Sequence, residues 1–129
     1  MKKPALAVAA ILVASAAQAQ WSQLGRNENL RLFLDQTTIQ RDGDIARMWQ
    51  LYDYITAQWA GEQVIYSVKN LVEYDCSGKR TRILGGSAYG EHMGQGKVVA
   101  SENAPNAEWS LIPPGGTAEN MWSIACDKN

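Results

Sequence analysis

The chain has little of what catalytic and metal sites are built from. Its 129 residues include one histidine, His92, and two cysteines, Cys76 and Cys126. A histidine-based triad needs a nucleophile and an orienting carboxylate, and no recognisable motif supplies them. A zinc site needs further ligands at characteristic spacings, which the chain lacks. His92 or Met93 could ligate a haem iron, but the sequence contains no cysteine motif for haem attachment. We therefore expect no enzyme activity, no metal and no cofactor, and we interpret His92 as a surface residue.

The chain also lacks an apolar run long enough to span a bilayer. Its longest run is Ala5 to Ala14, which follows two lysines and precedes Ala17-Gln18-Ala19. A positive start, a short apolar run and an A-x-A pattern are typical of a secretory signal peptide. The sequence therefore predicts a signal peptide over residues 1–19, cleavage between Ala19 and Gln20, and an exported domain over residues 20–129. Because no cysteine stands at the cleavage point, we expect no lipid anchor.

An excess of basic residues is missing as well. Without the two lysines of the signal, ten basic residues stand against thirteen acidic ones, a net charge of −3. A nucleic-acid-binding domain usually carries a net positive surface. We therefore expect no nucleic-acid partner.

Two cysteines in an exported chain most simply form one disulfide, in preference to a metal or redox site. The pair Cys76–Cys126 would close a loop of 50 residues. On the loop-entropy model such a crosslink stabilises the fold by about 4 kcal/mol. For a domain of this size that is a large share of the total stability.

Alternating apolar and polar residues predict strands through most of the exported chain. We expect strands at 30–34, 45–54, 64–76, 97–101 and 109–112. Asp42-Gly43 is a turn signal that should reverse the chain between the first two. Ser77-Gly78 fits a hairpin loop that would pair Glu73 with Arg82 and Asp75 with Arg80. The sequence thus predicts an antiparallel sheet.

The pattern changes after Pro113-Pro114-Gly115-Gly116, where a short helix is expected. Thr117 is a suitable N-cap, and a helical stripe runs from Ala118 to Cys126. Because Cys76 lies on the apolar face of its strand, one disulfide would tie this helix to the sheet. The predicted fold is α+β: a single antiparallel sheet with a C-terminal helix packed on one face.

The candidate binding residues are less well determined. Basic side chains of the predicted hairpin could gather on its outer face and engage an acidic protein or polysaccharide. The glycine-rich segment 85–96 is expected to be a mobile loop, and such loops often carry function. The candidate residues are Lys69, Lys79, Arg80, Arg82, Tyr89 and His92.

The order of these landmarks resembles the surface-adhesin protein E family over nearly all of the exported chain. The resemblance rests on WSQLG at Trp21, FLD at Phe33, RDGDIARMWQLYDY at Arg41, EYDCSGKRTRIL at Glu73 and SLIPPGGTAENMWSIAC at Ser110. It implies an antiparallel sheet with a disulfide-tethered C-terminal helix. It also implies a non-catalytic adhesin, with host extracellular-matrix proteins such as vitronectin or laminin as ligands.

Two further hypotheses stay open. One is a periplasmic small-ligand binder or an inhibitor of an enzyme such as lysozyme, with segment 87–97 as the inserting element. The other is an exported enzyme that depends on His92. Sequence alone leaves the protein periplasmic or secreted.

Overall fold

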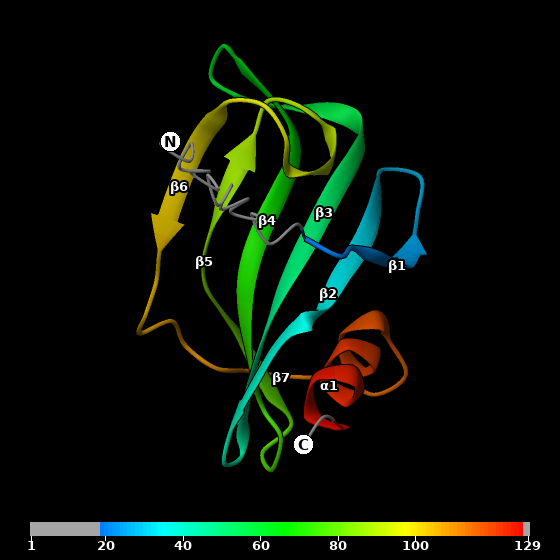
Figure 1. The fold of residues 1–129 in the computed structure, drawn as a ribbon, viewed down its shortest axis with the longest axis vertical. Helices are drawn as coiled ribbons and strands as arrows, with labels where there is room; N and C mark the ends of the chain where they lie inside the picture. The colour runs from blue at the N-terminus through cyan, green and yellow to red at the C-terminus, as the bar shows by residue number, and fades with distance from the viewer. Residues whose placement is uncertain (1–18, 128–129) are drawn as a thin grey trace, which may run out of the picture.

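The computed structural model describes residues 19–127, and it contains one antiparallel sheet and one α-helix (Figure 1). The strands are β1 (Ser22–Arg26), β2 (Leu30–Asp42), β3 (Ile45–Ala60), β4 (Gln63–Asp75), β5 (Arg80–Tyr89), β6 (Val98–Asn103) and β7 (Ser110–Leu111). A 3₁₀ turn, η1 (His92–Gly94), precedes β6, and the helix α1 (Thr117–Asp127) ends the described chain. The predicted fold class is confirmed.

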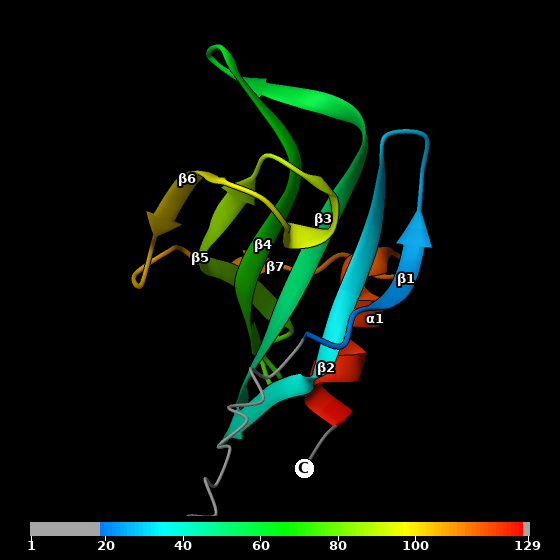
Figure 2. The same cartoon turned by 45° about the horizontal axis from the view of Figure 1, so that its top comes forward.

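The strands are joined in their chain order. The sheet runs β1-β2-β3-β4-β5-β6 with every pair antiparallel, and β7 pairs with the beginning of β5. The β3–β4 hairpin extends beyond the neighbouring strands (Figure 2). Adjacent strands are therefore connected locally, and two of these connections, β2–β3 and β4–β5, lie at the predicted turn signals.

The turn between β2 and β3 lies where the sequence predicted it. Gly43 has φ +60°, a left-handed conformation that suits glycine, and Asp42 pairs with Ile45. Both strands are longer than expected. In β2 the register shifts between Asp35 and Gln40, and pairing resumes after this irregularity. The sequence-based boundary at residue 34 was wrong because a bulge interrupts the alternation without ending the strand.

The β4–β5 hairpin has the predicted pairs Glu73–Arg82 and Asp75–Arg80. Its loop has four residues, 76–79, rather than two, and Lys79 adopts φ +51° within it. The side of this hairpin that was expected to face water is also covered, since Glu73 is only 2% exposed. Arginine side chains cover the carboxylates there, as described below.

One face of the sheet, here called the helix face, forms the core with α1. The helix packs against β2, β3 and β4 toward one end of the sheet (Figure 1). The disulfide Cys76–Cys126 joins the helix to the end of β4, with 5.6 Å between the Cα atoms. Trp122 adds a hydrogen bond of 3.0 Å from its indole Nε1 to the Asp75 carbonyl oxygen. The buried core side chains are Leu32, Leu34, Ala46, Met48, Val72, Tyr74, Ile112, Met121 and Ala125.

Candidate functional site

The opposite face of the sheet, here called the open face, carries the candidate site. Side chains alternate between faces along a strand, so neighbours of the core residues Met48 and Val72 point to the open side. Trp49 pairs with Leu71, and Lys69 pairs with Leu51 on one side and with Ser87 on the other. Three central strands, β3, β4 and β5, thus contribute side chains to this face.

A hollow of about 430 Å³ lies on the open face, and we call it the Lys69 groove. Lys69 lies directly between Leu51 of β3 and Ser87 of β5. Trp49 of β3 and Tyr89 of β5 are its diagonal neighbours on these two strands. Diagonal neighbours in a sheet lie within reach of aromatic and long side chains. The groove residues are Ala19, Trp21, Asp35, Thr37, Thr38, Trp49, Lys69, Ser87 and Tyr89.

Lys69 is a cation without a carboxylate partner. Its Nζ lies 5.0 Å from the centre of the Tyr89 ring, and within residues 19–127 it forms no ion pair. Its aliphatic stem runs beside Gly94 of η1, where an added Cβ would overlap the Lys69 Cε. The ammonium group is therefore held beside an aromatic ring and left available to an anion.

Polar groups at the bulge of β2 form one wall of the groove. The Asp35 Oδ1 accepts hydrogen bonds from the Thr37 backbone N–H (3.0 Å) and hydroxyl (2.5 Å). The Thr38 hydroxyl donates to the Asp35 carbonyl oxygen and accepts from the Trp49 backbone N–H at 3.0 Å. These bonds fix the bulge against β3, beside the exposed Trp49 ring.

The remaining predicted binding residues do not join the groove. Arg80 pairs with Asp75 at 2.7 Å and Arg82 with Glu73 at 2.6 Å, and both guanidinium groups lie over the Trp109 ring. Lys79 pairs with Glu119 of α1 and lies over the Trp122 ring. Of the six candidates, only Lys69 and Tyr89 are brought together in the groove.

The carboxylates of this hairpin are held in their charged form. Hydrogen bonds from the Gly78 backbone N–H and the Arg80 guanidinium lower the pKa of Asp75 to about 2. Burial of Glu73 opposes its ionisation, but Arg47 and Arg82 outweigh that effect and lower the pKa of Glu73. Such strongly paired groups stabilise the hairpin and are poorly suited to proton transfer near neutral pH.

His92 lies in a fixed turn. Its Nδ1 is 3.1 Å from Asp53 Oδ1, the Met93 N–H donates to the same oxygen, and the Gly94 N–H donates to Ser67 Oγ at 2.8 Å. The segment 85–96, predicted to be a mobile loop, is therefore largely structured: its first residues belong to β5 and η1 is bonded to the sheet.

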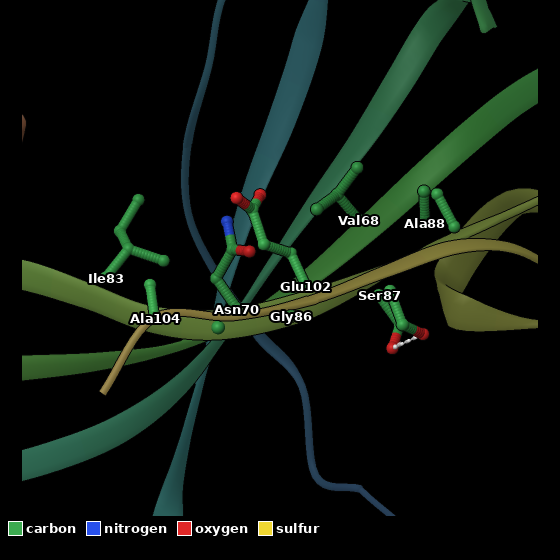
Figure 3. Close-up of a pocket in the computed structure, with 11 residues that line it drawn as sticks. Val68, Asn70, Ile83, Gly86, Ser87, Ala88, Glu102 and Ala104 are labelled. Carbon is green, nitrogen blue, oxygen red and sulfur yellow. Dashed lines mark hydrogen bonds between the residues drawn. The ribbon is translucent and has the colours of Figure 1, made fainter. Parts of the chain in front are cut away.

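A second hollow, of about 660 Å³, lies on the helix face beyond the reach of α1. Figure 3 shows Val68, Asn70, Ile83 and Glu102 projecting into it, while Ser87 points to the other side of the sheet. Its lining is mostly small and aliphatic, and its one charged residue is Glu102. It lacks the aromatic and cationic groups that distinguish the Lys69 groove.

The groups of the Lys69 groove are suited to contacting a ligand. Residues 19–127 contain no cluster of three histidine, cysteine, aspartate or glutamate side chains that could hold a metal ion. The same part of the chain has no helix with the length and apolar character of a membrane span. What the groove supplies is one cation, exposed aromatic surface and fixed hydroxyl groups.

Sequence reasoning missed Trp49, Asp35, Thr37 and Thr38 as groove residues. Alternation did place Trp49 on the face opposite Ala46 and Met48, which was the available signal. The threonines follow the end of the expected strand, so nothing in the pattern placed them opposite Trp49.

Comparison with known proteins supports the same family as the sequence motifs. The family model described as surface-adhesin protein E matches residues 21–127. A search of curated proteins found no match.

Solved structures of Haemophilus influenzae protein E share the fold. Crystal form II has a TM-score of 0.68 at 18% identity, covering 85% of this chain and 89% of that one. The protein from non-typeable Haemophilus influenzae has a TM-score of 0.64 at 17% identity, covering 89% and 82%. Because the family model spans most of the chain, the protein belongs to the surface-adhesin protein E family, a family of adhesin-like binding proteins.

Proposed function

We propose that the protein is an exported adhesin that binds host extracellular-matrix proteins, with vitronectin and laminin as candidate ligands, through the Lys69 groove. Family membership supports the adhesin role. The single observation that points to this groove is Lys69, a cation without an ion-pair partner among residues 19–127, held beside the Tyr89 ring over a hollow.

We choose this surface because Lys69 differs from the other basic candidate residues. Lys79, Arg80 and Arg82 are already paired with carboxylates of this chain. A partner's acidic group would have to displace those carboxylates, whereas at Lys69 it displaces only water. Trp49 is 37% exposed beside it, and Trp and Tyr are enriched among residues that dominate binding energy.

A periplasmic small-ligand binder is the second candidate. A hollow of about 430 Å³ is within the size range of small-molecule sites. The inhibitor version of this hypothesis needs a projecting loop, yet η1 is bonded to Asp53 and Ser67. The groove therefore favours a small acidic ligand over insertion of segment 87–97 into an enzyme.

The test compares two lysine variants on immobilised vitronectin and laminin at physiological salt, with the wild-type chain as reference. Lys69→Met removes the groove cation, and Lys97→Met removes an exposed lysine before β6. We expect Lys69→Met to weaken binding about tenfold or more, because a charge-assisted hydrogen bond contributes roughly 1.5–3 kcal/mol. Lys97→Met should bind like the wild type.

Equal losses in both variants would indicate a diffuse charge effect and contradict the groove. Failure of the wild type to bind either matrix protein would remove the matrix-binding proposal. Protease treatment of intact cells, with a periplasmic marker as control, completes the test: digestion of the protein supports surface display, and protection favours the periplasmic alternative.

A further inference from the structure

Asp35 is a buried carboxylate that lacks a cationic side-chain partner. It is 3% exposed, and no Lys, Arg or His side chain in residues 19–127 forms an ion pair with it. Its Oδ1 is used by Thr37, as described above. Burying a charged group is unfavourable unless it is paired and hydrogen-bonded. The group that stabilises the charge of Asp35 should therefore be found at its other oxygen, Oδ2.

The partner of Oδ2 is the backbone nitrogen of Gln20, at 3.0 Å. This is the nitrogen that the predicted cleavage between Ala19 and Gln20 would set free. The A-x-A pattern and the position of Asp35 are independent observations that point to the same atom. Hydrolysis of that peptide bond consumes one water and leaves a carboxylate on Ala19 and an α-amino group on Gln20.

We propose that processing at Ala19–Gln20 creates an ion pair between the new α-ammonium group of Gln20 and Asp35, and that this pair completes one wall of the Lys69 groove. The amide N–H donates one hydrogen bond, whereas an α-ammonium group donates up to three and carries a full charge. Charge-assisted bonds of this kind are shorter and stronger than neutral ones. The buried carboxylate thus receives the cation that the described side chains do not supply.

The pair has a direct effect on the groove. Ala19 and Trp21 both line it, one on each side of Gln20 in the sequence. Cleavage removes Ala19 and so widens the groove at this end, while the ion pair holds Trp21 in place just before β1. Processing would therefore convert a groove partly filled by Ala19 into the wider groove that binds a ligand.

The same pair protects the new terminus chemically. An N-terminal glutamine cyclises when its unprotonated α-nitrogen attacks the side-chain carbonyl carbon and ammonia leaves. A protonated nitrogen bound to Asp35 has no free electron pair for this attack. We expect cyclisation of the mature chain to be slow, and Asp35→Asn to accelerate it.

The test uses full mature chains with two different first residues, Gln20 and Ala19, each made with Asp35 intact and with the Asp35→Asn substitution. In the chain that begins at Ala19 the charge is displaced by one residue, about 3.8 Å along the backbone. Asp42→Asn, which changes an exposed acid on β2, is the matched control. The readouts are the unfolding equilibrium constant in urea and the loss of ammonia by intact mass.

We expect Asp35→Asn to raise the unfolding equilibrium constant about tenfold more in the chain that begins at Gln20 than in the chain that begins at Ala19, because only the first has the charged pair. Asp42→Asn should have the same small effect in both. Equal effects of Asp35→Asn in the two chains would overturn the ion pair, as would unchanged cyclisation. An exported chain whose intact mass starts at a residue other than Gln20 would also overturn the proposal. None of these outcomes bears on whether the groove binds matrix proteins.

Discussion

Replacing both cysteines by alanine tests the stability of the fold most directly, because the disulfide links α1 to the end of β4. Cys76–Cys126 closes a loop of 50 residues, and its removal should cost about 4 kcal/mol through the greater freedom of the unfolded chain. With a urea dependence of about 2 kcal/mol per M for a small domain, the unfolding midpoint should fall by about 2 M.

The helix should nevertheless remain docked. Met121 and Ala125 are buried against the sheet, and Trp122 donates to the Asp75 carbonyl oxygen. We therefore expect a native circular dichroism spectrum in the absence of urea. Because the Lys69 groove lies on the other face of the sheet, ligand binding by the folded variant should be unchanged.

Equilibrium unfolding of the Cys76→Ala/Cys126→Ala variant checks both statements. A loss below about 1 kcal/mol would refute the reasoning, because the crosslink would then contribute no more than one ordinary hydrogen bond. Loss of the native spectrum without urea would also refute it, since the helix would then depend on the disulfide alone.

Two further predictions concern the hairpin and the groove. The pKa of Asp75 is lowered to about 2 from 3.8, so its charged form stabilises the fold above pH 3.8 and that contribution fades as the pH falls toward 2. The melting temperature of Asp75→Asn should therefore lie below that of the wild type near neutral pH, and the gap should narrow between pH 4 and pH 2; a constant gap would contradict this. Gly94→Ala and Gly115→Ala should each cost about 1–2 kcal/mol, because both glycines have positive φ, +69° and +84°. Only Gly94→Ala displaces Lys69, so only this variant should weaken binding to matrix proteins; equal binding by both would contradict the role of the Lys69 stem.

The fold was largely predictable because its determinants are local. The Asp42-Gly43 turn, the alternation along β4 and the stripe from Ala118 to Cys126 each specify one element from neighbouring residues. The β4–β5 register followed from the agreement of turn position with charge pairing. A meander also needs no long-range choice of topology, since each strand pairs with the next one in the chain.

The site was predictable only in part. Lys69 and Tyr89 were proposed as binding residues, but their grouping with Trp49 depends on register across three strands. The wall at Asp35 depends on a bulge, which adds residues to one strand without leaving a clear sequence signal. The acidic partners of Arg80 and Arg82 were predicted with the hairpin, but the pairing of Lys79 with Glu119 on α1 was not.

Binding of two tryptophan variants to vitronectin and laminin tests the central claim most directly. Trp49 and Trp59 are both exposed, at 37% and 68%, but Trp49 lies in the Lys69 groove and Trp59 near the end of the β3–β4 hairpin. Trp49→Ala should weaken binding about tenfold or more while Trp59→Ala binds like the wild type, since buried aromatic contacts dominate binding energy. Loss of binding in Trp59→Ala with Trp49→Ala unaffected would move the binding surface to the hairpin and contradict the account.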